Sequence, residues 1–233
     1  MKQLLHGIMA GVLLLAFFLV GSSEDPVNAR SSLETDSFSG TGVVIKTATV
    51  RSNGPDGWIL ELSENASKGG ILNSTDYINL GDDILRNQYR SILSFPTGAA
   101  LPDNAVLTKV TLKLRYLGIV GGGNPVAIFQ GFMMDIKKGT FGTVSLQLTD
   151  WQAAADKTIG PFSPPRVGGW YTFDLTSIRA YINKLATLSG VTQIRLRFFR
   201  EDDDNFAANF LKFYSGNHLV PSRPTLIIEY QVP

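Results

Sequence analysis

The chain of 233 residues contains no cysteine, only two histidines and almost no net charge. The lack of cysteine excludes disulfides and thiolate metal ligands. Beyond the N-terminal apolar segment, His218 is the only histidine. A Ser-His-acid catalytic triad would have to use His218 with Ser215 or Ser222, and this single option disfavours nucleophilic catalysis. Lys and Arg total 21 against 20 acidic residues and form no basic stripe, so the composition does not favour nucleic-acid binding.

The one long apolar run lies near the N-terminus, from Ile8 to Gly21, with Lys2 before it and "VNA" at residues 27–29. A membrane-spanning helix needs about 20 apolar residues, and this run is shorter. The layout predicts a signal peptide at residues 1–29, a flexible lead-in at residues 30–42, and one folded domain at residues 43–233. We therefore expect a secreted protein, extracellular or at the cell surface, with no membrane segment after processing.

Beyond residue 42, apolar and polar residues mostly alternate with a period of two, which is typical of half-buried strands. In the segment from Val106 to Tyr116 one face is predicted to be apolar and the other polar. The apolar face has Val106, Val110, Leu112, Leu114 and Tyr116, and the polar face has Lys109, Thr111, Lys113 and Arg115. Gly, Pro, Asn and Asp clusters separate such segments. The predicted strands are Val43–Val50, Tyr77–Leu80, Tyr89–Phe95, Val106–Tyr116, Val126–Ile136, Val144–Leu148, Gly169–Asp174, Thr192–Phe199, Phe210–Tyr214 and Pro224–Val232.

Many short strands with turn signals between them predict an all-β fold, an antiparallel β-sandwich of jelly-roll type. One short helix is expected. Ile178, Tyr181, Ile182 and Leu185 follow helical spacing behind the capping candidate Thr176.

Three blocks resemble the DNRLRE-type domain family: "YRSILSFPTGAALPDNAVLTKVTLKLRY" (89–116), "WYTFDLTSIRAYIN" (170–183) and "FLKFYSGNHLVPSRPTLIIEY" (210–230). The resemblance implies a secreted β-sandwich grouped with carbohydrate-binding modules, some of them associated with acidic polysaccharides. The chain departs from the family pattern at Pro96, at Ser215–Asn217 and in lacking the hexapeptide that names the family. The resemblance therefore implies the fold more firmly than a sugar site.

Four consecutive acids, Glu201–Asp204, lie between two apolar runs. Calcium takes six to eight oxygen ligands, and loops dense in Asp and Asn supply them. If calcium is a cofactor here, Asp202, Asp204 and Asn205 are the expected metal ligands, because alternate loop residues can turn inward together. The alternative is a solvated hairpin turn whose charges discourage pairing at the sheet edge.

Sugar binding requires aromatic faces that stack on pyranose rings, and acidic sugars add a requirement for cations. The candidate cations are on strand faces predicted to be polar, and the candidate aromatics are at strand ends or turns. Each of them also has a structural interpretation, as a core plug or a solubilising surface group. The candidate ligand-binding residues are Lys113, Arg115, Arg195, Arg197, Trp58, Trp151, Trp170 and Tyr171.

The sequence and the resemblance together predict a secreted, non-enzymatic module whose partner is an extracellular carbohydrate, with an acidic polysaccharide as one candidate. The main alternative is a self-associating structural subunit of an extracellular filament, sheath or matrix, assembled by strand addition through Ser31–Gly42. An exported hydrolase is a third hypothesis. Adjacent Asp residues in one turn cannot flank a glycosidic bond, which argues against this third hypothesis.

Overall fold

The computed structural model describes residues 37–39 and 43–233. The predicted signal peptide and most of the predicted lead-in lie outside these residues. Strands dominate the described part of the chain, and the helices are short turns between them. The strands are β1 (Ser37–Ser39), β2 (Val43–Arg51), β3 (Gly57–Glu61), β4 (Gly69–Asn73), β5 (Tyr77–Asp82), β6 (Gln88–Phe95), β7 (Val106–Val120), β8 (Phe132–Lys138), β9 (Lys157–Phe162), β10 (Trp170–Asp174), β11 (Thr192–Phe198), β12 (Asn209–Tyr214) and β13 (Thr225–Gln231). The helices are α1 (Thr97–Ala100), α2 (Pro125–Ile128) and the 3-10 turns η1 (Leu148–Trp151), η2 (Thr176–Tyr181), η3 (Leu188–Gly190) and η4 (Val220–Ser222).

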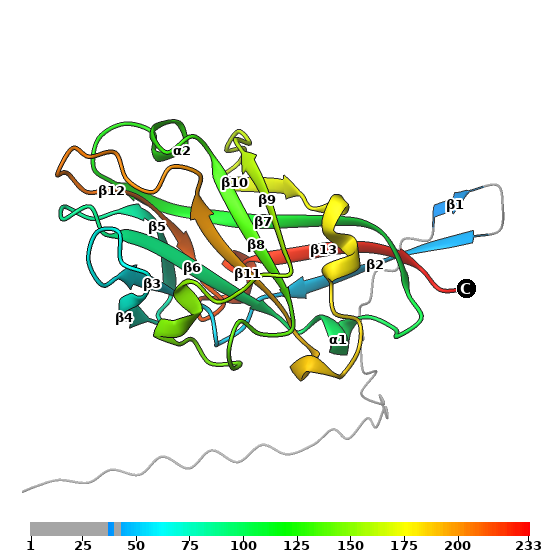
Figure 1. Cartoon of the computed structure of the whole chain (residues 1–233). Coiled ribbons are helices and arrows are strands. Elements are labelled where there is room, and N and C mark those ends of the chain that lie inside the picture. The colour runs from blue at the N-terminus through cyan, green and yellow to red at the C-terminus, as the bar shows by residue number, and fades with distance from the viewer. Residues whose placement is uncertain (1–36, 40–42) are drawn as a thin grey trace, which may run out of the picture. The chain divides into compact units, whose positions relative to one another are not determined.

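The strands form one antiparallel sheet that curls into two layers, which confirms the predicted all-β fold (Figure 1). The first layer has the order β1-β2-β13-β7, with β10 also paired to β7. The second has the order β12-β5-β6-β11-β8-β9, with β3 and β4 attached through β6. Strand β7 joins the layers, because its residues 106–113 pair with β13 and its residues 116–120 pair with β12.

The core lies between the layers and is built by the alternation read from the sequence. In β11, Ile194, Leu196 and Phe198 are buried in this core, and Leu226 and Ile228 of β13 face them from the other layer. Burying each such side chain stabilises the fold by roughly 1.5–3 kcal/mol. The ring of Phe132 is central, with its centroid 5.1–6.2 Å from those of four other aromatic rings, namely Tyr171, Phe173, Phe198 and Phe213.

Strand β7 departs from the predicted facing at its start. Val106 is exposed and Leu107 is buried, the reverse of the sequence prediction. The pairing of β7 with β13 shifts register between Glu229 and Tyr230, and this bulge turns the first residues of β7 over. From Val110 onward the alternation holds as predicted.

The strand predicted at Val126–Ile136 begins too early, because only its second part is strand β8, and the strand predicted at Val144–Leu148 is wrong. Asn124 caps α2 by accepting a hydrogen bond from the Val126 amide at 3.1 Å, and β8 begins only at Phe132. The second segment is a loop that runs into η1, where the Asp150 carboxylate accepts the Gln147 amide at 2.9 Å. Strands β1, β3, β4 and β9 were not predicted, and β1 lies within the predicted flexible lead-in.

The helix expected after Thr176 is the 3-10 turn η2, which ends at Tyr181. Ile178 and Ile182 are buried as predicted, but Leu185 lies beyond the turn and is partly exposed. Thr176 does not cap the turn, since its hydroxyl accepts a hydrogen bond from the Val110 amide at 3.2 Å. Within the described residues, no helix has the length and apolar character to cross a bilayer.

Candidate functional site

The outer face of the second layer is covered by the chain itself. Ile59 of β3 and Ile92 of β6 form a second apolar cluster with Phe141 and Trp151, which come from the segment between β8 and β9. This segment lies where an open, basic strand face was expected. The sequence pattern showed that the strands have two faces, but it did not show that the second face is also packed.

Arg195 is therefore buried rather than displayed on a basic platform. Its guanidinium lies 2.8 Å from the Asp135 carboxylate and donates to the carbonyls of Asp150 and Ala153 at 2.7 and 2.9 Å. Arg197 is half-buried, with its Nε 3.3 Å from the same carboxylate. The Arg195 contacts hold the covering segment, residues 139–156 between β8 and β9, against the sheet. The pair therefore cannot form the flat outer surface that the sequence predicted.

The charges in this network are mutually stabilising. Burial alone would raise the pKa of Asp135. The hydrogen bond from the Thr158 hydroxyl and the charges of Arg195 and Arg197 together lower it by more, so the pKa of Asp135 lies below the usual value. Burial also lowers the pKa of Arg195. The carboxylate and guanidinium both stay ionised at neutral pH, which makes the network a structural clamp.

Two of the three tryptophans are also structural. Trp151 is fully buried, with the Arg90 guanidinium carbon 4.0 Å from its ring centroid. Trp58 is buried in β3, with its ring edge-on to Tyr89 at 5.1 Å. Neither ring is accessible for stacking on a sugar in this conformation.

Trp170, Lys113 and Arg115 do come together, on the outer face of the first layer. Trp170 is opposite Arg115 in the β10–β7 register. The Lys113 ammonium lies 5.1 Å, and the Arg115 guanidinium carbon 5.4 Å, from the Trp170 ring centroid. Cation–π contact of this kind holds the two long side chains against the ring. These three predicted residues form one solvent-accessible group.

Arg51 extends this group across the layer. Thr225 of β13 is opposite Arg51 of β2 on one side and Lys113 of β7 on the other, and Thr172 of β10 is opposite Lys113. Neighbouring strands lie about 4.8 Å apart, which places the Arg51 and Lys113 backbones about 10 Å apart. We call the surface of Arg51, Lys113, Arg115 and Trp170 the basic face.

The cations of the basic face have no ion-pair partner within the described residues, whereas most other arginines of the layers do. The nearest acidic side chains on the same layer lie further along the strands. Glu229 is paired with Lys109 at 3.3 Å, and Asp174 accepts the Thr176 amide at 2.8 Å. The side chain of Thr176, and then its amide, lower the pKa of Asp174. The basic face therefore carries positive charge that the protein does not neutralise.

The sequence did not single out Arg51. It ends a strand after the threonine-rich alternation of β2, which marks it as outward-facing. Its place beside Lys113 depends on β13 lying between β2 and β7, and no local pattern specifies that order.

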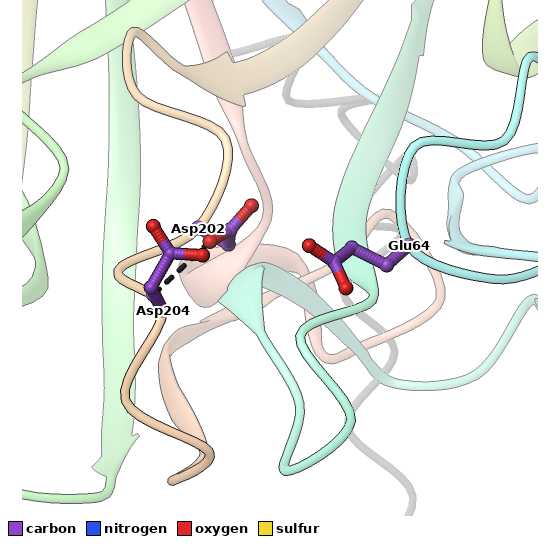
Figure 2. Close-up of side chains that lie close together, drawn as sticks. All are labelled: Glu64, Asp202 and Asp204. Atoms are coloured by element: carbon purple, nitrogen blue, oxygen red, sulfur yellow. Dashed lines mark hydrogen bonds between the residues drawn. The ribbon is translucent and has the colours of Figure 1, made fainter.

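The acidic turn brings two of the predicted metal ligands together. Carboxylate oxygens of Asp202, Asp204 and Glu64 all lie within 4.8 Å of one another (Figure 2). The Asp204 amide donates to the Asp202 carboxylate at 3.0 Å, which closes the turn between them. Burial raises the pKa of Asp202. Glu64, from the β3–β4 connection, was not predicted.

Positive charge already reaches this cluster from Arg86. Its guanidinium pairs with the Glu64 carboxylate and with Asp204 at 3.0 Å. Asn205 is not part of the cluster, because its side chain bonds the Asp203 carboxylate at 2.7 Å and the Ala207 amide at 2.7 Å. Three carboxylates supply only part of a calcium coordination shell, and Arg86 competes for two of them. The arrangement of these side chains is closer to the solvated turn, the alternative to a metal site. Calcium binding by Asp202, Asp204 and Asn205 stays a prediction.

The residues considered for nucleophilic catalysis are separated by other contacts. The Ser215 hydroxyl donates to the Thr75 carbonyl at 2.5 Å and accepts the Asn217 amide at 3.1 Å. The ring of His218 packs on that of Tyr214, with centroids 4.2 Å apart. No hydrogen bond joins His218 to a serine hydroxyl in the part of the chain that the structure describes.

Comparison of the sequence with models of known protein families gives no match, and comparison with curated proteins gives none either. The resemblance to DNRLRE-type domains therefore stays a prediction.

Proposed function

We propose that this protein is a secreted, non-catalytic module that binds an acidic extracellular polysaccharide on the basic face. The observation that supports this most directly is the group of Trp170, Lys113 and Arg115, where two cations without carboxylate partners lie against an accessible indole ring. An indole supplies a stacking surface for a sugar ring, and the cations supply partners for its carboxylate. Binding requires no covalent step.

The shape of the basic face suits a polymer better than a small molecule. The face is an antiparallel strand surface on which Arg51, Thr225, Lys113 and Thr172 follow one another across four strands. The Thr225 hydroxyl between Arg51 and Lys113 donates to the Arg223 carbonyl at 2.9 Å, and its lone pairs can accept from a sugar hydroxyl. A linear polyanion crossing the strands would meet a charge about every second strand, at a spacing of about 10 Å.

Affinity gel electrophoresis tests the proposal directly. Gels containing alginate or polygalacturonate should retard the full chain, and a gel containing neutral dextran should not. Added salt should weaken the retardation, because exposed charges are screened over about 10 Å at 0.1 M ionic strength.

Variants then place the binding on the basic face. Lys113→Ala with Arg115→Ala, and separately Trp170→Ala, should abolish retardation. Lys109→Ala is the matched control, since it removes an exposed cation of the same strand that is already paired with Glu229. Free migration of the unmodified protein in every uronate gel would exclude the proposal, as would retardation that survives the double substitution.

Arg195→Ala is not a suitable binding variant, although the sequence pointed to it. Arg195 holds the covering segment, and its loss would weaken the fold whether or not a ligand binds.

The alternative function, a structural subunit that assembles into filaments, is tested by a different experiment. Strand β1, which lies inside the segment expected to add to a neighbouring sheet, pairs with β2 of its own chain. Concentration-dependent filaments in electron micrographs, lost on deletion of Ser31–Gly42, would favour assembly over polysaccharide binding.

A further inference from the structure

A cavity of about 660 Å³ lies at one end of the two layers, and the basic face does not include it. It is bounded by the second half of β7, by the start of α2, by the connection from β9 to β10, and by Tyr171 and Leu211. In Figure 1, α2 and the loop before β10 are at the end opposite α1. We call it the end cavity. Its volume falls within the range of about 300–1,000 Å³ that is usual for small-molecule sites.

Tyr171 is the buried polar group of this cavity. Its residue is only 7% exposed, and its ring packs against Phe132 and Phe213 at centroid distances of 5.4 and 5.7 Å. No hydrogen bond within the described residues involves its hydroxyl, and this oxygen is not one of the fully buried atoms that lack a partner, so it is accessible from the end cavity. Burial raises the pKa of Tyr171, and the charge of Arg166, which lines the same cavity, partly offsets this.

Arg166 gives the end cavity a positive charge. Its guanidinium carbon lies 3.9 Å from the centroid of the Tyr116 ring, which fixes the plane of the guanidinium while its N–H groups stay available. No acidic side chain lines the cavity within the described residues, and Arg166 forms no ion pair there. Asn124 and Ser163 add further polar groups to the wall.

These groups define the ligand chemistry. A guanidinium fork binds a carboxylate through two parallel hydrogen bonds. Tyrosine hydroxyls, an amide and a serine hydroxyl suit several hydroxyl groups, and the apolar wall of Ile119, Val126 and Leu211 suits the C–H face of a ring.

We propose that the end cavity binds one hydroxylated ring carrying a carboxylate, a single uronic acid residue, with Arg166 on the carboxylate and Tyr171 on a hydroxyl. This rests on the proposed function for the identity of the sugar class. Tyr116 follows Arg115 on β7, and its amide bonds the carbonyl of Gly169 next to Trp170 at 2.9 Å. The end cavity and the basic face therefore use successive residues of β7, whose side chains point to opposite faces of the strand.

Titration calorimetry of the full chain with sodium glucuronate tests the inference, with glucose as the uncharged control. Glucuronate should bind in the millimolar range and glucose more weakly. Tyr171→Phe removes only a hydroxyl that has no partner in the described structure, so it should leave the urea midpoint unchanged and weaken glucuronate binding about tenfold. Arg166→Ala should abolish binding, and Lys113→Ala should leave it intact.

The outcomes separate this inference from the proposed function. Absence of glucuronate binding, or binding that Tyr171→Phe and Arg166→Ala leave unchanged, overturns the end-cavity site, even if uronate gels still retard the protein. Glucuronate binding that depends on both residues supports the site, even if the gels fail to retard the protein and the basic-face proposal falls.

Discussion

Replacing Arg195 with alanine should destabilise the protein strongly, because Arg195 joins three separate parts of the chain. Its guanidinium pairs with Asp135 of β8 at 2.8 Å and donates to the carbonyls of Asp150 and Ala153 in the covering segment. The Phe141 ring packs on the guanidinium, with its centroid 4.6 Å from the guanidinium carbon. The substitution leaves a buried carboxylate and two carbonyls without these partners.

The expected loss is about 3–5 kcal/mol of unfolding free energy, the usual cost of removing one partner from a buried ion pair. Arg197 still reaches the Asp135 carboxylate at 3.3 Å, which favours the lower end of this range. For a domain of this size each kcal/mol lowers Tm by about 2–4 °C, so Tm should fall by at least about 6 °C.

Urea unfolding measures this loss, with Lys113→Ala as the control for removal of an exposed cation from the other layer. A double-mutant cycle with Asp135→Ala tests the mechanism. The double variant should lose less than the sum of the single losses, because neither charge is left alone. An Arg195→Ala variant that unfolds within 1 kcal/mol of the unmodified protein, judged against a cost of several kcal/mol for such pairs, would show that the clamp is not structural.

Three further predictions concern other parts of the structure. Asp56 is fully buried, and burial raises its pKa to about 7. Stability from this group is complete at acid pH and is lost as pH rises toward 7, so the urea midpoint should fall from pH 5 to pH 8. Asp56→Asn should make this profile shallower but not flat, because burial also raises the pKa of Asp82 to about 7, and an unchanged slope would contradict the assignment. Gly216→Ala should lower the free energy of unfolding by several kcal/mol. A Cβ there would lie 2.6 Å from the carbonyl oxygen of Asn53, and the Gly216 amide donates to the Asp56 carboxylate at 2.9 Å, so the backbone cannot move away freely. A Tm close to that of the unmodified protein would contradict this. EDTA should leave the Tm of the unmodified protein unchanged, because Arg86 pairs with the acidic cluster. The Arg86→Ala variant should have a lower Tm, and added calcium should raise that Tm. Calcium-dependent melting of the unmodified protein would refute this.

The alternation in the sequence predicted the first layer and the core well. In β10, β11 and β13 one face is apolar and the other polar, and the period of two identifies such strands directly. Strand β3 was missed because all five of its residues are buried. A strand packed on both faces shows no alternation, and five residues are too few to identify it otherwise.

The candidate site was predicted only in part, for a related reason. Lys113, Arg115 and Trp170 were named from the sequence and do come together, because they lie on outward positions of paired strands. Arg195 and Arg197 show the same pattern, but a segment about 50 residues earlier in the chain covers them. A polar position in a strand indicates which face a side chain is on, and only the tertiary structure shows whether that face is open to solvent.

Strand β7 supplies Lys113 and Arg115 to the basic face and Tyr116 and Ile119 to the end cavity, and it is a single continuous strand. The distance between the two sites is thus a fixed length of backbone rather than the span of a mobile linker. A polymer occupying both proposed sites would have to pass from one face of β7 to the other, and it would be held with one polarity, its last ring inserted and its body extending toward β2. A cell surface coated with such a protein would collect chains aligned by their ends, and digestion that creates new ends would increase its capacity.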